Sequence, residues 1–218
     1  FRQMGDLFFT ARVTVFLGQL YWKQGELEKA AEYYEACLAL DRQIRFWNEI
    51  TSDLRELGDI YRSLGRYEQA GQSYTESMAV CREHGLGPCN QWFSLGLLAL
   101  QQDNYTLAEQ HFSQPGNLDQ MSPGTPGLML SGLAAAAAKL GQAERAARLH
   151  SAARAMLNAN NYRLRPDEQA EVEGYIQAAR GQLGEQAFEA LETEGSVMSL
   201  EQAVAYAREM INHRPSKE

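Results

Sequence analysis

Apolar and small residues recur along this chain with the spacing of α-helices that pack in pairs. Four segments align without gaps, and each has a small residue in second position and an alanine at its end. They begin at residues 17, 57, 95 and 133 and read LGQLYWKQGELEKA, LGDIYRSLGRYEQA, LGLLALQQDNYTLA and LAAAAAKLGQAERA. The starts are 40, 38 and 38 residues apart. A repeat of this length predicts helical hairpins that stack, because one hairpin cannot bury its apolar face alone.

The repeated positions have a packing role. The small residues of the first helices are Gly18, Gly58, Gly96 and Ala134. The terminal alanines are Ala30, Ala70, Ala108 and Ala146, and the ring four residues later belongs to Tyr34, Tyr74, Phe112 or His150. A small residue lets the second helix approach closely, and the ring lies on the same face as the alanine. We therefore expect Ala30, Ala70 and His150 to be buried. Glycines at 25, 65 and 141 are expected just past the first helices, with Asp103 in that place in the third copy.

These positions resemble the tetratricopeptide consensus from residue 8 to about residue 158, although the family's usual period is shorter, at ~34 residues. The resemblance implies an all-α fold, a superhelical solenoid of antiparallel helix pairs. We expect hairpins at 8–44, 47–84, 89–114 and 126–159, capping helices at 161–213 and a disordered tail at 214–218. The alternative, an ordinary amphipathic bundle, gives no reason for the same positions to recur.

Two irregular regions follow from turn and cap signals. The segment 113–127 is rich in proline and glycine and is either a plain surface loop or a moving element. Thr125 and Pro126 are expected as the N-cap and first residue of the next helix. Near the C-terminus we expect helices at 166–183, 184–192 and 200–212, with Ser199 and Gln202 forming a capping box.

The C-terminal segment also resembles the end of large bacterial STAND ATPase regulators, including LuxR-type and maltose-activator-like transcription factors. The resemblance lies in Gly184, Phe188, Gly195, Met198, Ser199, Ala203 and Val204. It implies a sensor domain preceded by nucleotide-binding and effector domains. The alternative from another class is a free-standing scaffold for protein assembly.

Composition excludes several classes of function. The net charge of −8 argues against direct nucleic-acid binding, which needs a basic face. No apolar run approaches the ~18 residues of a membrane span. No phosphate-binding loop or hydrolase motif occurs, so we expect no enzyme activity, catalytic residue or cofactor. The odd cysteine number, three, predicts reduced thiols in the cytoplasm. Cys81, His84 and Cys89 lack a fourth metal ligand, so we expect no metal.

The first helix of each hairpin is expected to line a concave binding face. The candidate residues are Arg12, Gln19, Trp22, Lys23, Arg55, Asp59, Arg62, Asn90 and Phe93. Four of these carry positive charge in an acidic chain, which would suit an acidic peptide, a protein segment or an anionic small-molecule inducer. Solvated arginines on an ordinary surface are the alternative.

The N-terminal end has a distinct expectation. Residues 1–5, FRQMG, parallel residues 81–85, CREHG, at the end of a second-repeat helix. The chain is therefore expected to start at the end of a preceding repeat. Without that repeat the first hairpin would expose apolar surface, including Phe8 and Phe9. Because exposed apolar patches promote association, we expect self-association through this end.

Overall fold

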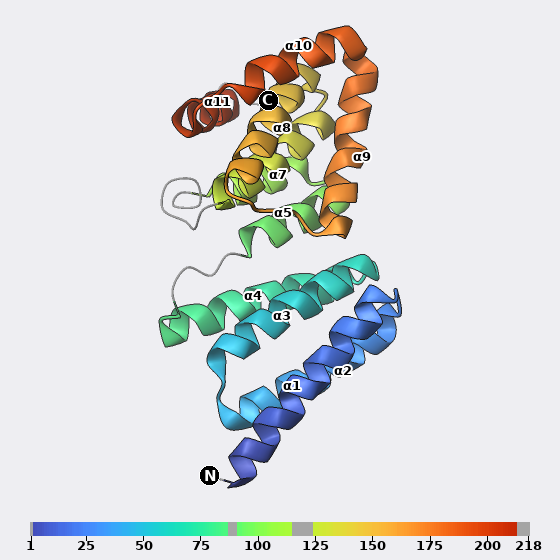
Figure 1. Ribbon diagram of the computed structural model, residues 1–218, viewed down its shortest axis with the longest axis vertical. Helices are drawn as coiled ribbons and strands as arrows, with labels where there is room; N and C mark the ends of the chain where they lie inside the picture. Colours follow the sequence, from blue (N-terminus) through green and yellow to red (C-terminus); the bar gives the residue numbers. More distant parts are fainter. Residues whose placement is uncertain (1, 87–90, 115–123, 213–218) are drawn as a thin grey trace, which may run out of the picture. The chain divides into compact units, whose positions relative to one another are not determined.

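The computed structural model describes residues 2–86, 91–114 and 124–212, and within these ranges regular structure is entirely α-helical (Figure 1). The helices are α1 Arg2–Lys23, α2 Leu27–Ile44, α3 Trp47–Ser63, α4 Tyr67–His84, α5 Trp92–Gln101, α6 Tyr105–Phe112, α7 Thr125–Lys139, α8 Ala143–Ala159, α9 Pro166–Leu183, α10 Glu185–Ser196 and α11 Leu200–Asn212. The pairs α1–α2, α3–α4 and α7–α8 pack most extensively. The predicted all-α fold of paired helices is confirmed. None of the described helices is both long and apolar enough to span a bilayer.

Contact between a glycine and an aromatic ring brings the helices of a pair together. A Cβ atom added to Gly58 would lie 2.4 Å from Cε1 of Tyr74, and one added to Gly18 would lie 3.0 Å from Cδ2 of Tyr34. A larger residue at these sites would push the helices apart, because cores are packed without spare room. The terminal alanines are fully buried, as predicted: Ala30, Ala70, Ala108 and Ala146.

The turns between paired helices use left-handed backbone conformations. Gly25, Gly65 and Gly141 have φ values of 79°, 72° and 73°, and Asp103 has a φ of 55° at the corresponding place. Glycine adopts this conformation without the steric penalty of a Cβ atom. The predicted ends of the first helices are therefore confirmed.

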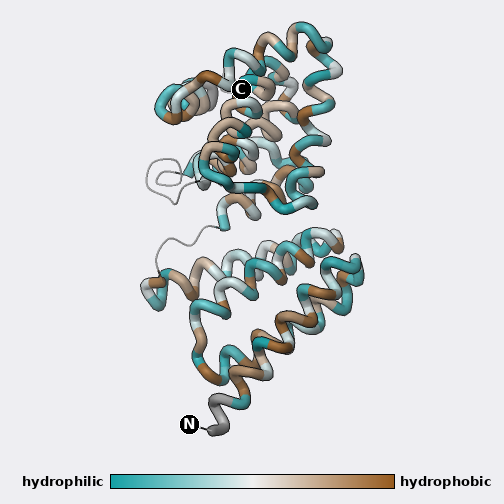
Figure 2. Tube along the Cα trace, in the orientation of Figure 1, coloured by the Kyte–Doolittle hydropathy of each residue, from teal (hydrophilic) through white to brown (hydrophobic). Residues whose placement is uncertain are grey.

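The chain divides into two compact units, residues 1–98 (unit 1) and 99–218 (unit 2), with the boundary inside α5. The sequence pattern changes later, near residue 160. In unit 1, apolar and polar positions alternate around α1 to α4 (Figure 2). The apolar faces form one core that includes Tyr34, Ile50, Ile60 and Tyr74.

The centre of unit 2 is α7, which contacts α6, α8, α9 and α11. Its residues from Gly127 to Ala138 are all buried. A Cβ atom on Gly132 would lie 2.3 Å from Cε1 of Phe112, so α6 and α7 meet through a third glycine–ring contact. The run of small residues in α7 therefore has a packing cause, since it lets several helices approach one helix.

The C-terminal helices pack back on α7 and α8. The predicted capping box is present: the Ser199 amide donates to Gln202 Oε1 at 2.8 Å, and the Gln202 amide donates to Ser199 Oγ at 3.3 Å. Two boundaries differ from prediction. Helix α7 begins at Thr125, with Gly124 as its N-cap, and α10 continues to Ser196. Residues 115–123 of the predicted loop and the predicted tail at 214–218 lie outside the described residues.

Candidate protein-binding surface

Four of the residues predicted to line a binding face lie on α1, and they differ in exposure. Lys23 is exposed, whereas Gln19 and Trp22 are partly exposed. Arg12 turns toward α2, where its Nη2 atom lies 2.5 Å from Oδ2 of the fully buried Asp41. The charge of Arg12 is therefore largely neutralised within the first hairpin.

On α3 the predicted residues belong mostly to a buried polar network. Arg55 is partly exposed and lies 3.4 Å from Asp59 Oδ2. Asp59 is 1% exposed, and its Oδ1 atom accepts a hydrogen bond of 2.7 Å from the Tyr74 hydroxyl. Burial, followed by the charge of Asp59, raises the pKa of Tyr74, and the Arg62 charge partly offsets this. Arg62 itself is 3% exposed. The expectation that Asp59 and Arg62 line an open binding face is wrong, because both are buried and the buried Tyr74 hydroxyl needs polar partners.

The predicted binding face is interrupted further along the chain as well. Phe93 is 3% exposed, so it is a core residue rather than a surface anchor. Asn90 lies outside the described residues. The predicted residues that reach solvent are Arg12, Gln19, Trp22, Lys23 and Arg55, and Arg12 is already paired with Asp41.

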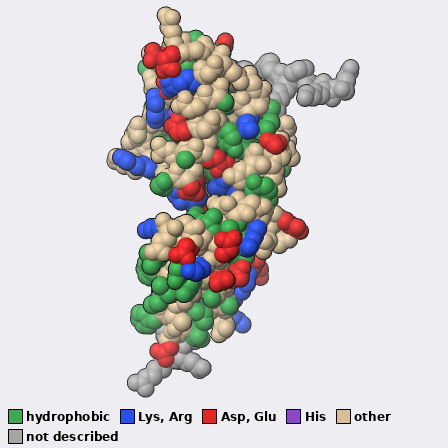
Figure 3. Space-filling view, turned by 90° about the vertical axis from the view of Figure 1, so that its right-hand side faces the viewer, with side chains coloured by type: hydrophobic (Ala, Val, Ile, Leu, Met, Phe, Trp, Pro, Cys, Tyr) green, Lys and Arg blue, Asp and Glu red, His purple; other side chains and the backbone are tan. Residues whose placement is uncertain are grey.

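An exposed apolar surface, which the predicted binding face does not include, lies along α1. Its residues are the exposed large hydrophobic side chains of α1: Phe9 (70%), Phe16 (67%), Val13 (59%), Leu20 (48%) and Leu17 (37%). We call these five residues the α1 stripe. Their spacing places them on one side of a helix. Hydrophobic side chains also gather near the N-terminus in the space-filling view (Figure 3). The exposure expected for Phe9 is confirmed, whereas Phe8 is partly covered and packs edge-on against Phe46.

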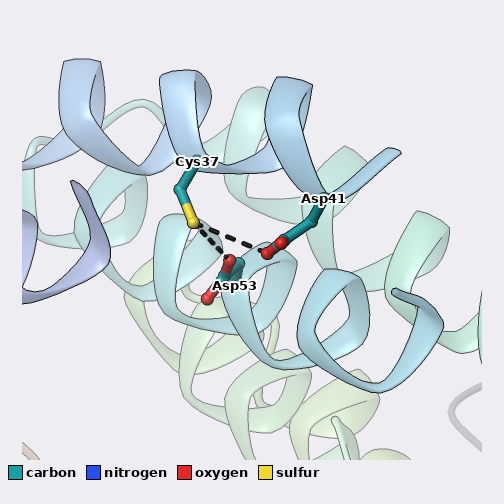
Figure 4. Close-up of side chains that lie close together, drawn as sticks. All are labelled: Cys37, Asp41 and Asp53. Atoms are coloured by element: carbon teal, nitrogen blue, oxygen red, sulfur yellow. Dashed lines mark hydrogen bonds between the residues drawn. The ribbon is translucent and has the colours of Figure 1, made fainter. Parts of the chain in front are cut away.

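A buried cluster of polar side chains lies between α2 and α3 (Figure 4). Sγ of Cys37 lies 3.1 Å from Oδ2 of Asp53 and 3.5 Å from Oδ2 of Asp41. Burial, reinforced by the Asp41 carboxyl, raises the pKa of Asp53 to about 7, against the opposing effect of its hydrogen bond with Cys37. Burial likewise raises the pKa of the Cys37 thiol. The cluster therefore favours protonated forms of both groups.

The donor atoms of Cys37, Asp41 and Asp53 lie within 4.8 Å of one another, which is close enough to surround a metal ion. However, Arg12 donates to Asp41 and its Nη2 atom lies 3.8 Å from Cys37 Sγ. A guanidinium already supplies the positive charge at this place, and metal binding requires a deprotonated thiolate. The residues therefore fit a buried ion pair with two neutral neighbours better than a metal centre.

The cysteines do not all match the sequence prediction. Cys37 is a free thiol, but Cys81 is disulfide-bonded. The expectation of a reduced, packed thiol is therefore wrong at Cys81. The ring of His84 stacks on Trp47 with centroids 3.9 Å apart, and Cys89 lies outside the described residues.

Comparison with known proteins identifies the two hairpins of unit 1. Residues 11–44 and 54–85 each match a family described as the tetratricopeptide repeat. These two segments are tetratricopeptide repeats. The matches cover α2 and α4 completely, with most of α1 and part of α3. Among curated proteins, none matches the chain.

The tetratricopeptide repeats make unit 1 a protein-interaction module. Hairpins of this kind present helix faces to partners rather than an enclosed catalytic centre. Sequence reasoning found the repeats but missed most of the α1 stripe. The signal was available, because positions 9, 13, 16, 17 and 20 are all large and apolar.

Proposed function

We propose that this chain is a protein-interaction domain of a larger STAND-type regulator and that the α1 stripe is its assembly surface. The exposure of that stripe is the observation that carries the proposal, because contiguous apolar patches on proteins mark interaction sites. The exposed Lys23 and the partly exposed Trp22 and Arg55 would offer a separate surface for an acidic peptide. The resemblance of the C-terminal segment supports the regulator context.

The repeat itself indicates what kind of element packs on the stripe. The α1 stripe aligns, 40 residues later, with Glu49, Asp53, Glu56, Leu57 and Ile60 of α3. That face of α3 packs on α2: Tyr34 donates a hydrogen bond to Glu56, and Cys37 contacts Asp53. The α1 stripe is thus the side of a first helix that receives another helix in this fold.

The chemistry of the two faces differs, and this difference selects the occupant. Three of the five α3 positions are acidic, and two of these, Asp53 and Glu56, meet polar groups of α2, whereas all five stripe residues are apolar. A helix with hydroxyl or thiol groups would leave them unpaired against the stripe. A partner helix with an apolar face would fit the α1 stripe, and the α1 stripe of another copy is itself such a face. We therefore assign the occupant as α1 of a second copy, related by a two-fold axis.

The size of the stripe sets the expected strength of the dimer. From Phe9 to Leu20 the helix rises ~17 Å at ~1.5 Å per residue. A contact along one helix of this length buries less surface than a typical stable interface, which buries about 1,600 Å². The dimer should therefore be weak and depend on protein concentration, with the two phenylalanines contributing most of the binding energy.

Sedimentation velocity over a wide concentration range tests this. We expect the unaltered chain to dimerise and the variant with Phe9→Ser and Phe16→Ser to remain monomeric, with an unchanged circular dichroism spectrum and melting temperature. Val197→Ser is the matched control, because Val197 is 78% exposed but lies in unit 2. A chain that stays monomeric throughout, or a stripe variant that dimerises equally well, would refute the proposal.

The regulator context has its own test. The free-standing scaffold remains the competing assignment, and the α1 stripe is compatible with either. The sequence of the complete gene distinguishes them, since a STAND regulator encodes a phosphate-binding loop ahead of this segment. A complete gene without that loop would leave the scaffold as the function.

A further inference from the structure

Unit 2 contains a cavity of about 310 Å³ that the repeat pattern does not explain. It lies among α7, α8, α9 and the segment between α8 and α9. Tyr162 of that segment packs against α7's N-cap, where a Cβ atom on Gly124 would lie 2.7 Å from the Tyr162 ring. The volume is at the lower end of the range for small-molecule sites.

A buried histidine forms part of the cavity wall. His150 is 7% exposed, and no group among the described residues hydrogen-bonds to its Nδ1 atom. Its Nε2 atom lies 3.8 Å from Glu173 Oε1, beyond hydrogen-bond distance. Burial, with the nearby Arg154 charge, lowers the pKa of His150 to about 4. The neutral ring has one donor and one acceptor nitrogen, and of these Nδ1 is itself buried.

Charges of both signs also line the cavity. Arg154 follows His150 by one helical turn on α8, and Arg163 lies on the segment before α9. Guanidinium groups bind carboxylates through two parallel hydrogen bonds. Arg154 already contacts Glu192 at 3.2 Å, but its side chain remains 55% exposed. Glu173 of α9 contributes a carboxylate that is 42% exposed.

These charges discriminate between classes of ligand. A simple anion attracted by the arginines would be repelled by Glu173, and a simple amine attracted by Glu173 would be repelled by the arginines. A molecule with both a carboxylate and an ammonium group satisfies all three residues. The remaining wall includes Leu157, Leu164 and Val172, which suit an apolar side chain.

We propose that this cavity binds a small zwitterion, an α-amino acid with an apolar side chain. The arginines hold the carboxylate, Glu173 holds the ammonium group, and His150 hydrogen-bonds to the bound molecule. This site goes beyond the protein interaction proposed above and does not involve α1.

Calorimetric titration of the full chain with alanine, valine, leucine, methionine and phenylalanine tests the proposal. We expect at least one to bind and to shift the imidazole NMR signals of His150. For leucine, the matched probes are 4-methylpentanoate, which lacks the amine, and 3-methylbutylamine, which lacks the carboxylate. Equivalent probes serve for another amino acid that binds, and each should bind at least about tenfold more weakly than the parent.

Variants assign the two charges separately. Glu173→Gln should weaken binding of the amino acid about tenfold but strengthen binding of the amine-free probe, because the carboxylate that repels this anion is gone, whereas Arg163→Gln should weaken both. Glu144→Gln on α8, whose carboxylate is 70% exposed and outside the cavity, is the control. If no amino acid binds at millimolar concentration, or if the amine-free probe binds equally well, the proposal is overturned. Because α1 is untouched, neither result changes the dimer test.

Discussion

The first helix of unit 1 and the last helices of unit 2 differ in how much of their apolar surface is buried. Helix α1 leaves a stripe of five large apolar side chains exposed. In unit 2, helices α9, α10 and α11 cover α7 and α8, and they bury Phe188, Ile176 and Ala207 almost completely. The difference supports the proposal that α1 receives another helix, whereas the C-terminal helices pack onto the other helices of their own unit.

The two regions also differ in their polar groups: buried hydrogen bonds join the helices of unit 2, whereas the α1 stripe has no polar side chain. Arg145 of α8 is buried and donates to Glu109 Oε1 at 2.6 Å and Gln142 Oε1 at 2.7 Å. It also donates to the Ala207 carbonyl at 3.3 Å, which ties α11 to α8. On α1 the stripe carries no polar group that could fix a partner's position. In unit 2, these hydrogen bonds fix the position of α11 on α8. The α1 stripe offers apolar contact alone.

The largest expected effect comes from breaking the hydrogen bonds of Arg145. Arg145→Ala should destabilise the chain by ~3–5 kcal/mol, because it removes the ion-pair partner of the buried Glu109 carboxylate. Urea unfolding followed by circular dichroism measures this change. Arg148→Ala is the control on the same helix, since its partner Glu194 is 56% exposed and a pair that solvent reaches should contribute about 1 kcal/mol or less.

A double variant sharpens the interpretation of Arg145. Replacing Arg145 with Met and Glu109 with Gln removes both charges at once and should recover much of the lost stability, because no buried charge remains. If the double variant is as unstable as Arg145→Ala, packing rather than charge explains the role of Arg145.

The next effect is a pH response of opposite sign in the two units. In unit 1, burial beside Asp41 raises the pKa of Asp53 from 3.8 to about 7. Between these values the folded chain holds a proton that the unfolded chain has lost, so stability decreases as pH rises from about 4 to 7. In unit 2, burial lowers the pKa of His150 from 6.5 to about 4. There the unfolded chain binds the proton first, so stability decreases as pH falls from about 6.5 to 4.

Two variants separate these contributions in urea unfolding at a series of pH values. Relative to Asp53→Asn, the unaltered chain should lose stability as pH rises, and relative to His150→Gln it should lose stability as pH falls. Each unit of pKa difference corresponds to about 1.4 kcal/mol. Parallel stability curves for the chain and either variant would show that the corresponding group does not titrate in this way.

The sequence predicted the helices well because their pairing depends on nearby residues. Gly58, Ala70 and Tyr74 recur in register, and each has one packing role. It predicted the binding face poorly because the direction of a polar side chain depends on a partner elsewhere. Asp59 reads as a surface residue in the repeat, but the Tyr74 hydroxyl, 15 residues away, holds it in the core. His150 was correctly expected to be buried. The cavity beside it could not be predicted, since most of its other lining residues lie at 157–173, near and beyond the end of the repeat pattern.

The smallest effects compare two glycines in the C-terminal helices. A Cβ atom on Gly195 would lie 2.2 Å from the backbone oxygen of Arg148, whereas one on Gly181 would meet nothing within 4 Å. Backbone cannot move aside as a side chain can, so Gly195→Ala should destabilise the chain by ~1–3 kcal/mol. Gly181→Ala lies inside α9 and should stabilise it by ~0.5–1 kcal/mol, because alanine loses less conformational freedom in a helix. Thermal melts should therefore shift in opposite directions. Equal shifts would mean that α10 does not approach α8 this closely, and the closed end of unit 2 would then resemble α1 more than the structure indicates.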